Sequence, residues 1–221
     1  MNVRLGRASA VAGLMGAALL ALSTSDRRAV AADHLDPPTR TDPAFDTTPD
    51  RSADIADIYA WHTADNLVMA LTFAGPAPRE QAATYDRDVL YTINISNNGA
   101  PGDAEVAIRF RFGKDAAGNT GVEISGLPDG GPPLVGPVET TLTRNGILAR
   151  AGLYDDPFFF DLQGFRDTRS TGTLSFVNTR SFFTGMNDTA MVIQIPRSRI
   201  EVQGHRLDIW VTSARIGGQL Q

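Results

Sequence analysis

Residues 105–113, EVAIRFRFG, alternate apolar and charged side chains, and this order strongly limits what the chain can fold into. Ile108, Phe110 and Phe112 fall on one side of an extended chain, and Arg109 and Arg111 fall on the other. Side chains of a β-strand point alternately to opposite faces. The segment therefore predicts an antiparallel strand with one face in a core and the other in solvent.

Further short strands, separated by turn residues, follow along the chain. Residues 54–63 and 67–73 flank a polar turn, residues 88–95 and 105–113 flank an Asn/Gly-rich turn, and Asn145-Gly146 marks a third hairpin. Strands are also expected at 121–125, 191–196 and 205–214, with a helical turn at 197–200. Residues 171–188 mix a strand pattern at 174–177 with a helical turn around Phe182. The sequence predicts an all-β fold, an antiparallel sandwich or irregular barrel with one or two short helical turns.

The first 31 residues have the order of a secretory signal peptide. A basic start precedes a short apolar run at 8–22 and small residues at 29–32. The apolar run is shorter than the about 20 residues that cross a bilayer comfortably. We expect cleavage after Ala31 or Ala32, a periplasmic or secreted protein, and no membrane span after cleavage.

The amino-acid composition limits the kinds of partner that this chain is expected to bind. The chain contains 0 Cys, which excludes disulfides, thiolate metal sites and a cysteine nucleophile. The net charge of -5, without a basic stripe, disfavours a nucleic-acid surface. A small ligand or a cation is the expected partner. We expect residues 32–52 to form an extended N-terminal arm and residues 53–221 to form a single β domain.

Residues 149–165, ARAGLYDDPFFFDLQGF, combine three carboxylates with four phenylalanines. Asp155, Asp156 and Asp161 surround Pro157 and the phenylalanine run at 158–160. Because aromatic rings favour burial, the segment predicts a buried structural plug that also holds a small polar or metal site. Alternatively, Asp155 and Asp156 form an Asx turn or cap a short helix at 158–162.

Several blocks together resemble a known family. These blocks are ADHLDPP at 32–38, ADIADIYAW at 53–61, YDRDVLYTINI at 85–95, IRFRF at 108–112 and DDPFFFDL at 155–162. In this order they resemble the DUF4331 family of exported bacterial proteins, from Asp33 to about Ala214. The resemblance implies export and the fold, but no activity, since the family is a domain of unknown function. Family members look richer in Asp in the turn where this chain has SNNG at 96–99.

The main candidate metal site joins the arm to the phenylalanine-rich segment. His34 and Asp36 come from the arm, and Asp57, Asp155 and Asp156 from the domain. Carboxylates beside buried aromatics need a cation, an arginine or backbone donors. Cleavage after Ala31 would also make His34 the third residue, which suits square-planar Cu²⁺ or Ni²⁺. The alternatives are that His34 and Asp36 pair inside the domain, and that the other acids form a structural network with Arg109, Arg111 and Arg150.

A weaker cation site is predicted in the turn after residues 88–95. Asn94, Asn98 and Glu105 fall at positions 1, 5 and 12 of an oxygen-rich Ca²⁺ loop, with Ser96 and Gly99 between them. An ordinary hairpin loop with turn-forming Asn and Gly explains the same residues.

The sequence contains no recognisable catalytic motif. A nucleophile elbow, a zinc-protease helix, a phosphate loop and a dinucleotide fingerprint are all missing. Tyr59, Trp61 and Tyr85 would suit a stacking platform for sugars if they are exposed. We expect an exported β domain of the cell envelope that binds a ligand or a metal cation without catalysis. The alternatives are a carboxylate-based envelope hydrolase and a structural envelope or matrix component.

Overall fold

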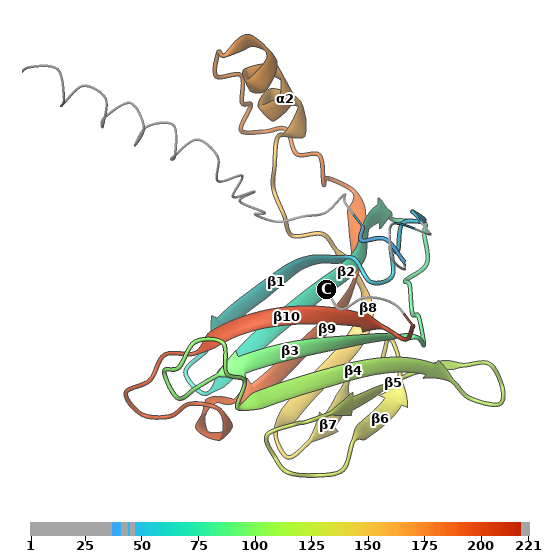
Figure 1. The fold of residues 1–221 in the computed structure, drawn as a ribbon, viewed down its shortest axis with the longest axis vertical. Helices are drawn as coiled ribbons and strands as arrows, with labels where there is room; N and C mark the ends of the chain where they lie inside the picture. Colours follow the sequence, from blue (N-terminus) through green and yellow to red (C-terminus); the bar gives the residue numbers. More distant parts are fainter. Residues whose placement is uncertain (1–36, 41–43, 45–46, 218–221) are drawn as a thin grey trace, which may run out of the picture. The chain divides into compact units, whose positions relative to one another are not determined.

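The computed structural model describes residues 37–40, 44 and 47–217, whose strands form two antiparallel sheets (Figure 1). The first sheet has the order β1-β2-β9-β8-β7 and the second β10-β3-β4-β5-β6. The predicted all-β sandwich is thereby confirmed. The predicted signal peptide, His34 and Asp36 lie outside the described residues.

The strands of the two sheets have the following bounds. The first sheet contains β1 (Ile55–His62), β2 (Asn66–Pro78), β7 (Leu142–Arg144), β8 (Ile147–Asp155) and β9 (Met186–Pro196). The second sheet contains β3 (Val89–Ser96), β4 (Val106–Lys114), β5 (Thr120–Ser125), β6 (Leu134–Pro137) and β10 (Asp208–Arg215). The helical elements are α2 (Leu162–Thr171), between β8 and β9, and the 3-10 turn η1 (Arg197–Arg199), between β9 and β10.

The three predicted hairpins are confirmed. β1 pairs with β2, β3 with β4, and β7 with β8, each in antiparallel register. Asn145 and Gly146 join β7 to β8 with φ of 50° and 82°, the left-handed pair that a two-residue type I′ turn requires. In β4, Ile108, Phe110 and Phe112 are buried while the intervening arginines are exposed, as the alternation predicts.

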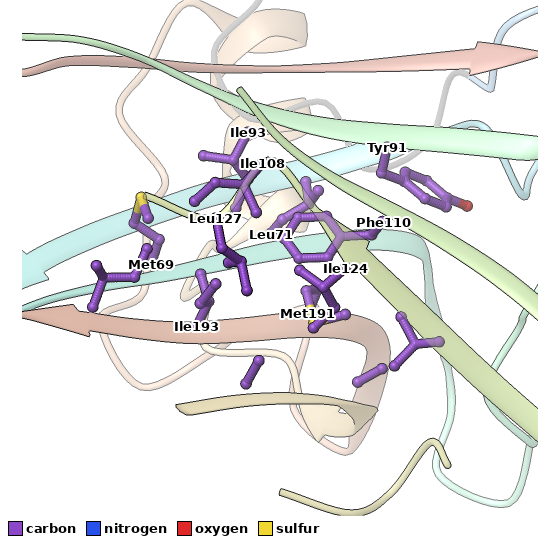
Figure 2. Packing of buried hydrophobic residues seen from close by; sticks show 14 of the residues in the cluster. Met69, Leu71, Tyr91, Ile93, Ile108, Phe110, Ile124, Leu127, Met191 and Ile193 are labelled. Atoms are coloured by element: carbon purple, nitrogen blue, oxygen red, sulfur yellow. The ribbon is translucent and has the colours of Figure 1, made fainter. Parts of the chain in front are cut away.

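The hydrophobic core lies between the two sheets. Figure 2 shows side chains of β2 and β9 packed with side chains of β3, β4 and β5. Within this core the rings of Phe73 and Tyr91 lie 4.1 Å apart between centroids, and Phe112 lies 6.0 Å from Phe73. The fully buried side chains of the labelled set are Met69, Leu71, Tyr91, Ile93, Ile108, Phe110, Ile124, Met191 and Ile193.

The strand expected at 174–177 does not form, and the residues around Phe182 form a turn without helix. The strand expected at 191–196 begins earlier, at Met186, because its first residues pair with both β2 and β8. Pairing on both sides gives these polar residues hydrogen-bond partners that the sequence pattern alone does not reveal.

The helix near the phenylalanine run lies later than predicted, because Asp161 supplies its N-cap. Asp161 Oδ1 accepts a hydrogen bond from Gly164 N at 2.9 Å, so α2 starts at Leu162 and the predicted helix at 158–162 is wrong. Asp156 Oδ1 accepts from Phe158 N at 2.9 Å, which confirms the alternative Asx turn.

The predicted burial of the phenylalanine run is also wrong. Phe159 is 59% exposed, while Phe158 and Phe160 are half-buried. Phe158 packs against Phe183 with ring centroids 5.1 Å apart, and Phe160 packs against Phe165 at 5.5 Å. Phe158, Phe160, Phe165 and Phe183 therefore cluster with one another in the segment around α2. None of these four rings belongs to the core between the sheets.

None of the helices in the described part of the chain has the length and hydropathy needed to cross a bilayer.

Candidate functional site

An open groove of about 720 Å³ lies where the end of β1 meets the segment between β9 and β10. β1 and β2 supply one side, and η1 with the following loop and the start of β10 supplies the other. The lining residues are Ala60, Trp61, His62, Leu67, Arg197, Ser198, Glu201, Val202, Gln203, Gly204, His205, Leu207 and Ile209.

Arg197 fixes the two sides of the groove to each other. Its Nη1 donates to the carbonyl oxygens of Thr63 and Ala64 at 3.3 and 3.0 Å, and its backbone N–H donates to Asp65 O at 2.9 Å. Its Nε donates to Glu201 Oε1 at 2.6 Å. One guanidinium thus joins the β1–β2 turn to η1 and the loop after it, which holds the groove open without a ligand.

The far side of the groove is fixed to the β3–β4 turn. Asn97 Nδ2 donates to Ile200 O at 2.7 Å. A Cβ at Gly99, where φ is +82°, would stand 2.8 Å from His205 Nδ1. The left-handed backbone favours glycine at this turn, and the absence of a side chain leaves room for the His205 ring.

Trp61 offers an aromatic surface to the groove, because its side chain is 49% exposed at the end of β1. Leu67, Leu207 and Ile209 are buried or half-buried and contribute apolar atoms nearby, while Val202 is 45% exposed. A large, half-exposed indole in a concave surface has an apolar face and one N–H donor available to a ligand.

The groove carries almost no net charge. Among the described residues that line the groove, Arg197 and Glu201 are the only Arg, Lys, Asp or Glu residues, and they neutralise each other in an ion pair. His62 and His205 add imidazole rings to the lining. His62 Nδ1 lies 3.1 Å from Thr63 O, and because a carbonyl oxygen only accepts, Nδ1 is the donor in this contact.

A second feature is the phenol of Tyr59, on which the charges of three carboxylates act. The Tyr59 hydroxyl donates to Asp57 Oδ2 at 2.9 Å. Burial raises the pKa of Tyr59 well above its ordinary value, and the hydrogen bond to Asp57 and the charges of Asp57, Asp156 and Asp188 raise it further. Asp156 and Asp188 are only 7% and 1% exposed. Of the predicted site residues, Asp57 therefore contacts this phenol, and the charge of Asp156 also acts on it.

Asp188, which sequence reasoning did not select, occupies space left by a glycine. A side chain at Gly75 would overlap the Asp188 carboxylate. No sequence signal marked Asp188, since it lies between Asn187 and Thr189, just before the strand predicted at 191–196.

The structure separates Asp155 from the other acids. Its carboxylate accepts a hydrogen bond from Arg79 Nη2 at 2.8 Å, and both side chains are largely exposed. Adjacent residues of an extended chain point to opposite sides, which explains why Asp155 and Asp156 have different surroundings.

The ion pairs in the structure differ from the predicted network of acids with Arg109, Arg111 and Arg150. Arg150 pairs with Glu139 at 3.3 Å, and Arg180 pairs with Asp161 at 2.6 Å. Arg109 and Arg111 lie on the exposed face of β4. The predicted network of these arginines with the acids of the 149–165 segment is therefore not what the structure contains.

The predicted calcium loop after β3 is an internally bonded hairpin loop. Glu105 Oε2 accepts from Asn97 N at 2.9 Å, its Oε1 accepts from Asn98 Nδ2, and Asn98 Oδ1 accepts from Ala100 N at 2.7 Å. Asn94 lies within β3, opposite Ala107. These contacts are those of the ordinary hairpin alternative.

Within the described residues, no three His, Cys, Asp or Glu side chains form a group that could hold a metal ion. The predicted contributions of His34 and Asp36 lie outside those residues, so the cation site remains a prediction.

No family model, curated protein or solved structure matches this chain. The resemblance to the DUF4331 family therefore also stays a prediction.

Sequence reasoning identified one wall of the groove and missed the other. The sequence predicts Trp61 as a stacking residue, but for the opposite wall it predicts only a helical turn at 197–200 and a strand that starts at His205. No motif marks this wall. The juxtaposition depends on Arg197 reaching the β1–β2 turn, more than 130 residues earlier in the chain.

Proposed function

We propose that this protein is a non-catalytic binding protein whose ligand occupies the Trp61 groove. The observation that carries the proposal is the half-exposed indole of Trp61 in an open groove of about 720 Å³. Arg197 holds this groove in place before any ligand arrives, and a preformed site loses less entropy on binding.

The chemistry of the lining favours an uncharged ligand rich in hydroxyl groups, such as a sugar. The Arg197–Glu201 pair leaves no excess charge to attract an ion. The apolar face of a sugar ring can stack on Trp61, while Ser198, Gln203 and His205 offer polar atoms to its hydroxyls. Glu201 is the only carboxylate of the lining, so the groove lacks the two facing acids of a carboxylate-based hydrolase.

A panel of immobilised oligosaccharides, probed with the purified protein, tests this proposal. We expect at least one neutral sugar to bind and Trp61→Ala to weaken its binding about 10-fold to 100-fold, since a central aromatic contact contributes ~1–3 kcal/mol. Ile216→Ala is the matched control, because Ile216 is 66% exposed and outside the groove. No binding anywhere on the panel, or equal binding by Trp61→Ala and the parent protein, would contradict the proposal.

A cation bound near Tyr59 is a second candidate. The charges of Asp57, Asp156 and Asp188 all act on the Tyr59 phenol, and a nearby cation would offset them. Ca²⁺ takes six to eight oxygen ligands and accepts water among them, so the acids need not complete its shell alone.

Elemental analysis of the mature protein, with its N-terminus fixed by intact mass, tests the cation. We expect about one equivalent of calcium that is lost in Asp57→Asn and retained in the exposed control Asp155→Asn. Copper or nickel would point instead to the N-terminal site predicted at His34. Protein free of all three metals would rule out this candidate and leave the groove proposal unaffected.

A further inference from the structure

The segment 157–185, between β8 and β9, is here called the aromatic lobe (Figure 1). Its two ends are held together, because Asp156 N donates to Met186 O at 3.0 Å. Within the lobe, Asp161 accepts hydrogen bonds from Val177 N and from Arg180 Nε at 2.8 and 2.6 Å. The hydrogen bond from Arg180 holds the pKa of Asp161 well below its usual range. These contacts give the lobe a fixed internal structure.

This lobe exposes an unusual amount of apolar surface. Five of the ten large exposed hydrophobic side chains of the described residues belong to it, although it is a small part of the chain: Phe159, Phe165, Leu174, Phe176 and Val177. Leu174 is 79% exposed and Phe159 is 59% exposed. Single exposed apolar residues need no explanation, but a concentration of this kind marks an interaction surface.

Two of the exposed side chains, Phe165 and Phe176, form a patch around the shared ring of Phe160. Phe160 lies 5.5 Å from Phe165 and 6.3 Å from Phe176, measured between ring centroids. Leu174 and Val177 flank Phe176 along the chain. The patch therefore brings together the end of the phenylalanine run, α2 and the loop after α2.

Cationic groups border the patch. Arg169 lies over the Phe165 ring, 5.8 Å from its centroid, and Arg166 is exposed on the same helix. Neither arginine forms an ion pair within the described part of the chain, whereas Arg180 is neutralised by Asp161. The lobe contains three Arg and two Asp, a net charge of +1, while the whole chain carries -5.

We propose that the aromatic lobe is a docking surface for a lipid bilayer with anionic headgroups. Exposed phenylalanines and leucine enter the headgroup and acyl-chain boundary, while Arg166 and Arg169 contact the anionic headgroups. The lobe carries a net positive charge and the rest of the chain a net negative charge. An anionic bilayer therefore attracts the lobe and repels the rest of the chain. The protein would rest on the membrane surface through this lobe.

The absence of cysteine from the chain allows a site-specific test. A single cysteine, Leu174→Cys, is labelled with an environment-sensitive fluorophore in the mature protein. The protein is then mixed with phosphatidylcholine vesicles that contain or lack phosphatidylglycerol. Val135→Cys is the matched control, since Val135 is an apolar residue of β6 with 66% exposure outside the lobe.

We expect the label at residue 174 to shift to the blue with phosphatidylglycerol vesicles and the label at 135 to stay unchanged. Adding Arg166→Gln and Arg169→Gln should weaken vesicle binding about 25-fold, about fivefold for each charge near the surface. Both side chains are exposed, so an unchanged melting temperature is expected for this variant.

Three results would overturn the proposal. The proposal would be wrong if the labels at 174 and 135 responded alike, or if the response at 174 were the same without phosphatidylglycerol. It would also be wrong if the arginine substitutions left vesicle binding unchanged. A blue shift at 174 that appears without vesicles and grows with protein concentration would assign the lobe to a second copy of this chain. None of these results depends on the Trp61 groove.

Discussion

Single residues decide the structure of the aromatic lobe, and Gly164 is the clearest case. A Cβ at this position would overlap Asp161 Oδ2 and stand 2.7 Å from Ser175 O and 2.9 Å from the Cα of Phe176. Glycine within a helix normally costs about 0.5–1 kcal/mol relative to alanine. At Gly164 the absence of a side chain outweighs this cost, because it lets the loop after α2 approach the helix backbone closely.

We expect Gly164→Ala to destabilise the lobe by about 1–3 kcal/mol, since the clash outweighs the gain in helix propensity. Amide hydrogen exchange of α2 measures the local effect, and urea unfolding measures the global one. The matched control is Gly113→Ala in β4, where no atom lies within 4 Å of the added Cβ and φ is ordinary. Equal exchange in the two variants would show that the close approach does not constrain the lobe.

Capping and turn residues set the boundaries of the elements. Asn145-Gly146 was recognisable in the sequence because a two-residue hairpin needs two left-handed residues and few dipeptides supply them. The N-cap of α2 was harder, since Asp155, Asp156 and Asp161 are all acceptable caps. The choice of Asp161 depends on Val177 and Arg180, which also bind its carboxylate. These partners come from residues far outside any local pattern.

Burial of an element also depends on its neighbours. The phenylalanine run looked like part of the core, yet it follows the last strand residue of β8 and leaves the sheet. Hydrophobic residues can cluster among themselves on a separate segment, as Phe158, Phe160, Phe176 and Phe183 do. The sequence indicates that such rings pack against apolar neighbours, but it does not show which residues those neighbours are.

At the scale of the whole molecule, Arg215 connects parts of the chain that are distant in sequence. Its guanidinium lies at the end of β10 and forms ion pairs with Asp50, before β1, and with Asp86, before β3. Arg215 and Asp50 side chains are 7% and 4% exposed. Hydrogen bonds from Ser213 Oγ to Ala53 O, at 2.6 Å, and from Tyr91 to Ser52 O reinforce the same junction.

We expect Arg215→Met to lower the free energy of unfolding by about 3–5 kcal/mol, because it leaves the buried Asp50 charge without its partner. Urea unfolding monitored by circular dichroism provides the measurement. Arg87→Met should change stability by less than about 0.5 kcal/mol, as Arg87 is 84% exposed in a surface pair.

A double variant separates lost charge pairing from lost packing. Adding Asp50→Asn to Arg215→Met should recover part of the stability, because the unpaired buried charge disappears. If the double variant is no more stable than Arg215→Met, the loss does not arise from Asp50.

The sequence by itself determined the features that depend on local chemistry. Alternation in β4 and the three hairpin turns follow from side-chain periodicity and from residues that favour particular backbone angles, whereas the Asx turn at Asp156 was one of two alternatives. The sandwich follows from many such strands.

Tertiary structure alone decided which distant residues meet. Trp61 faces a groove because Arg197 holds the loop after η1 against the β1–β2 turn. The charges of Asp57, Asp156 and Asp188 act on Tyr59 because β1, β2, β9 and β8 follow one another in one sheet. Sheet order and long-range hydrogen bonds produce these contacts. The sheet order and the hydrogen bonds depend on the free energy of the whole fold. A local pattern carries no information about that choice.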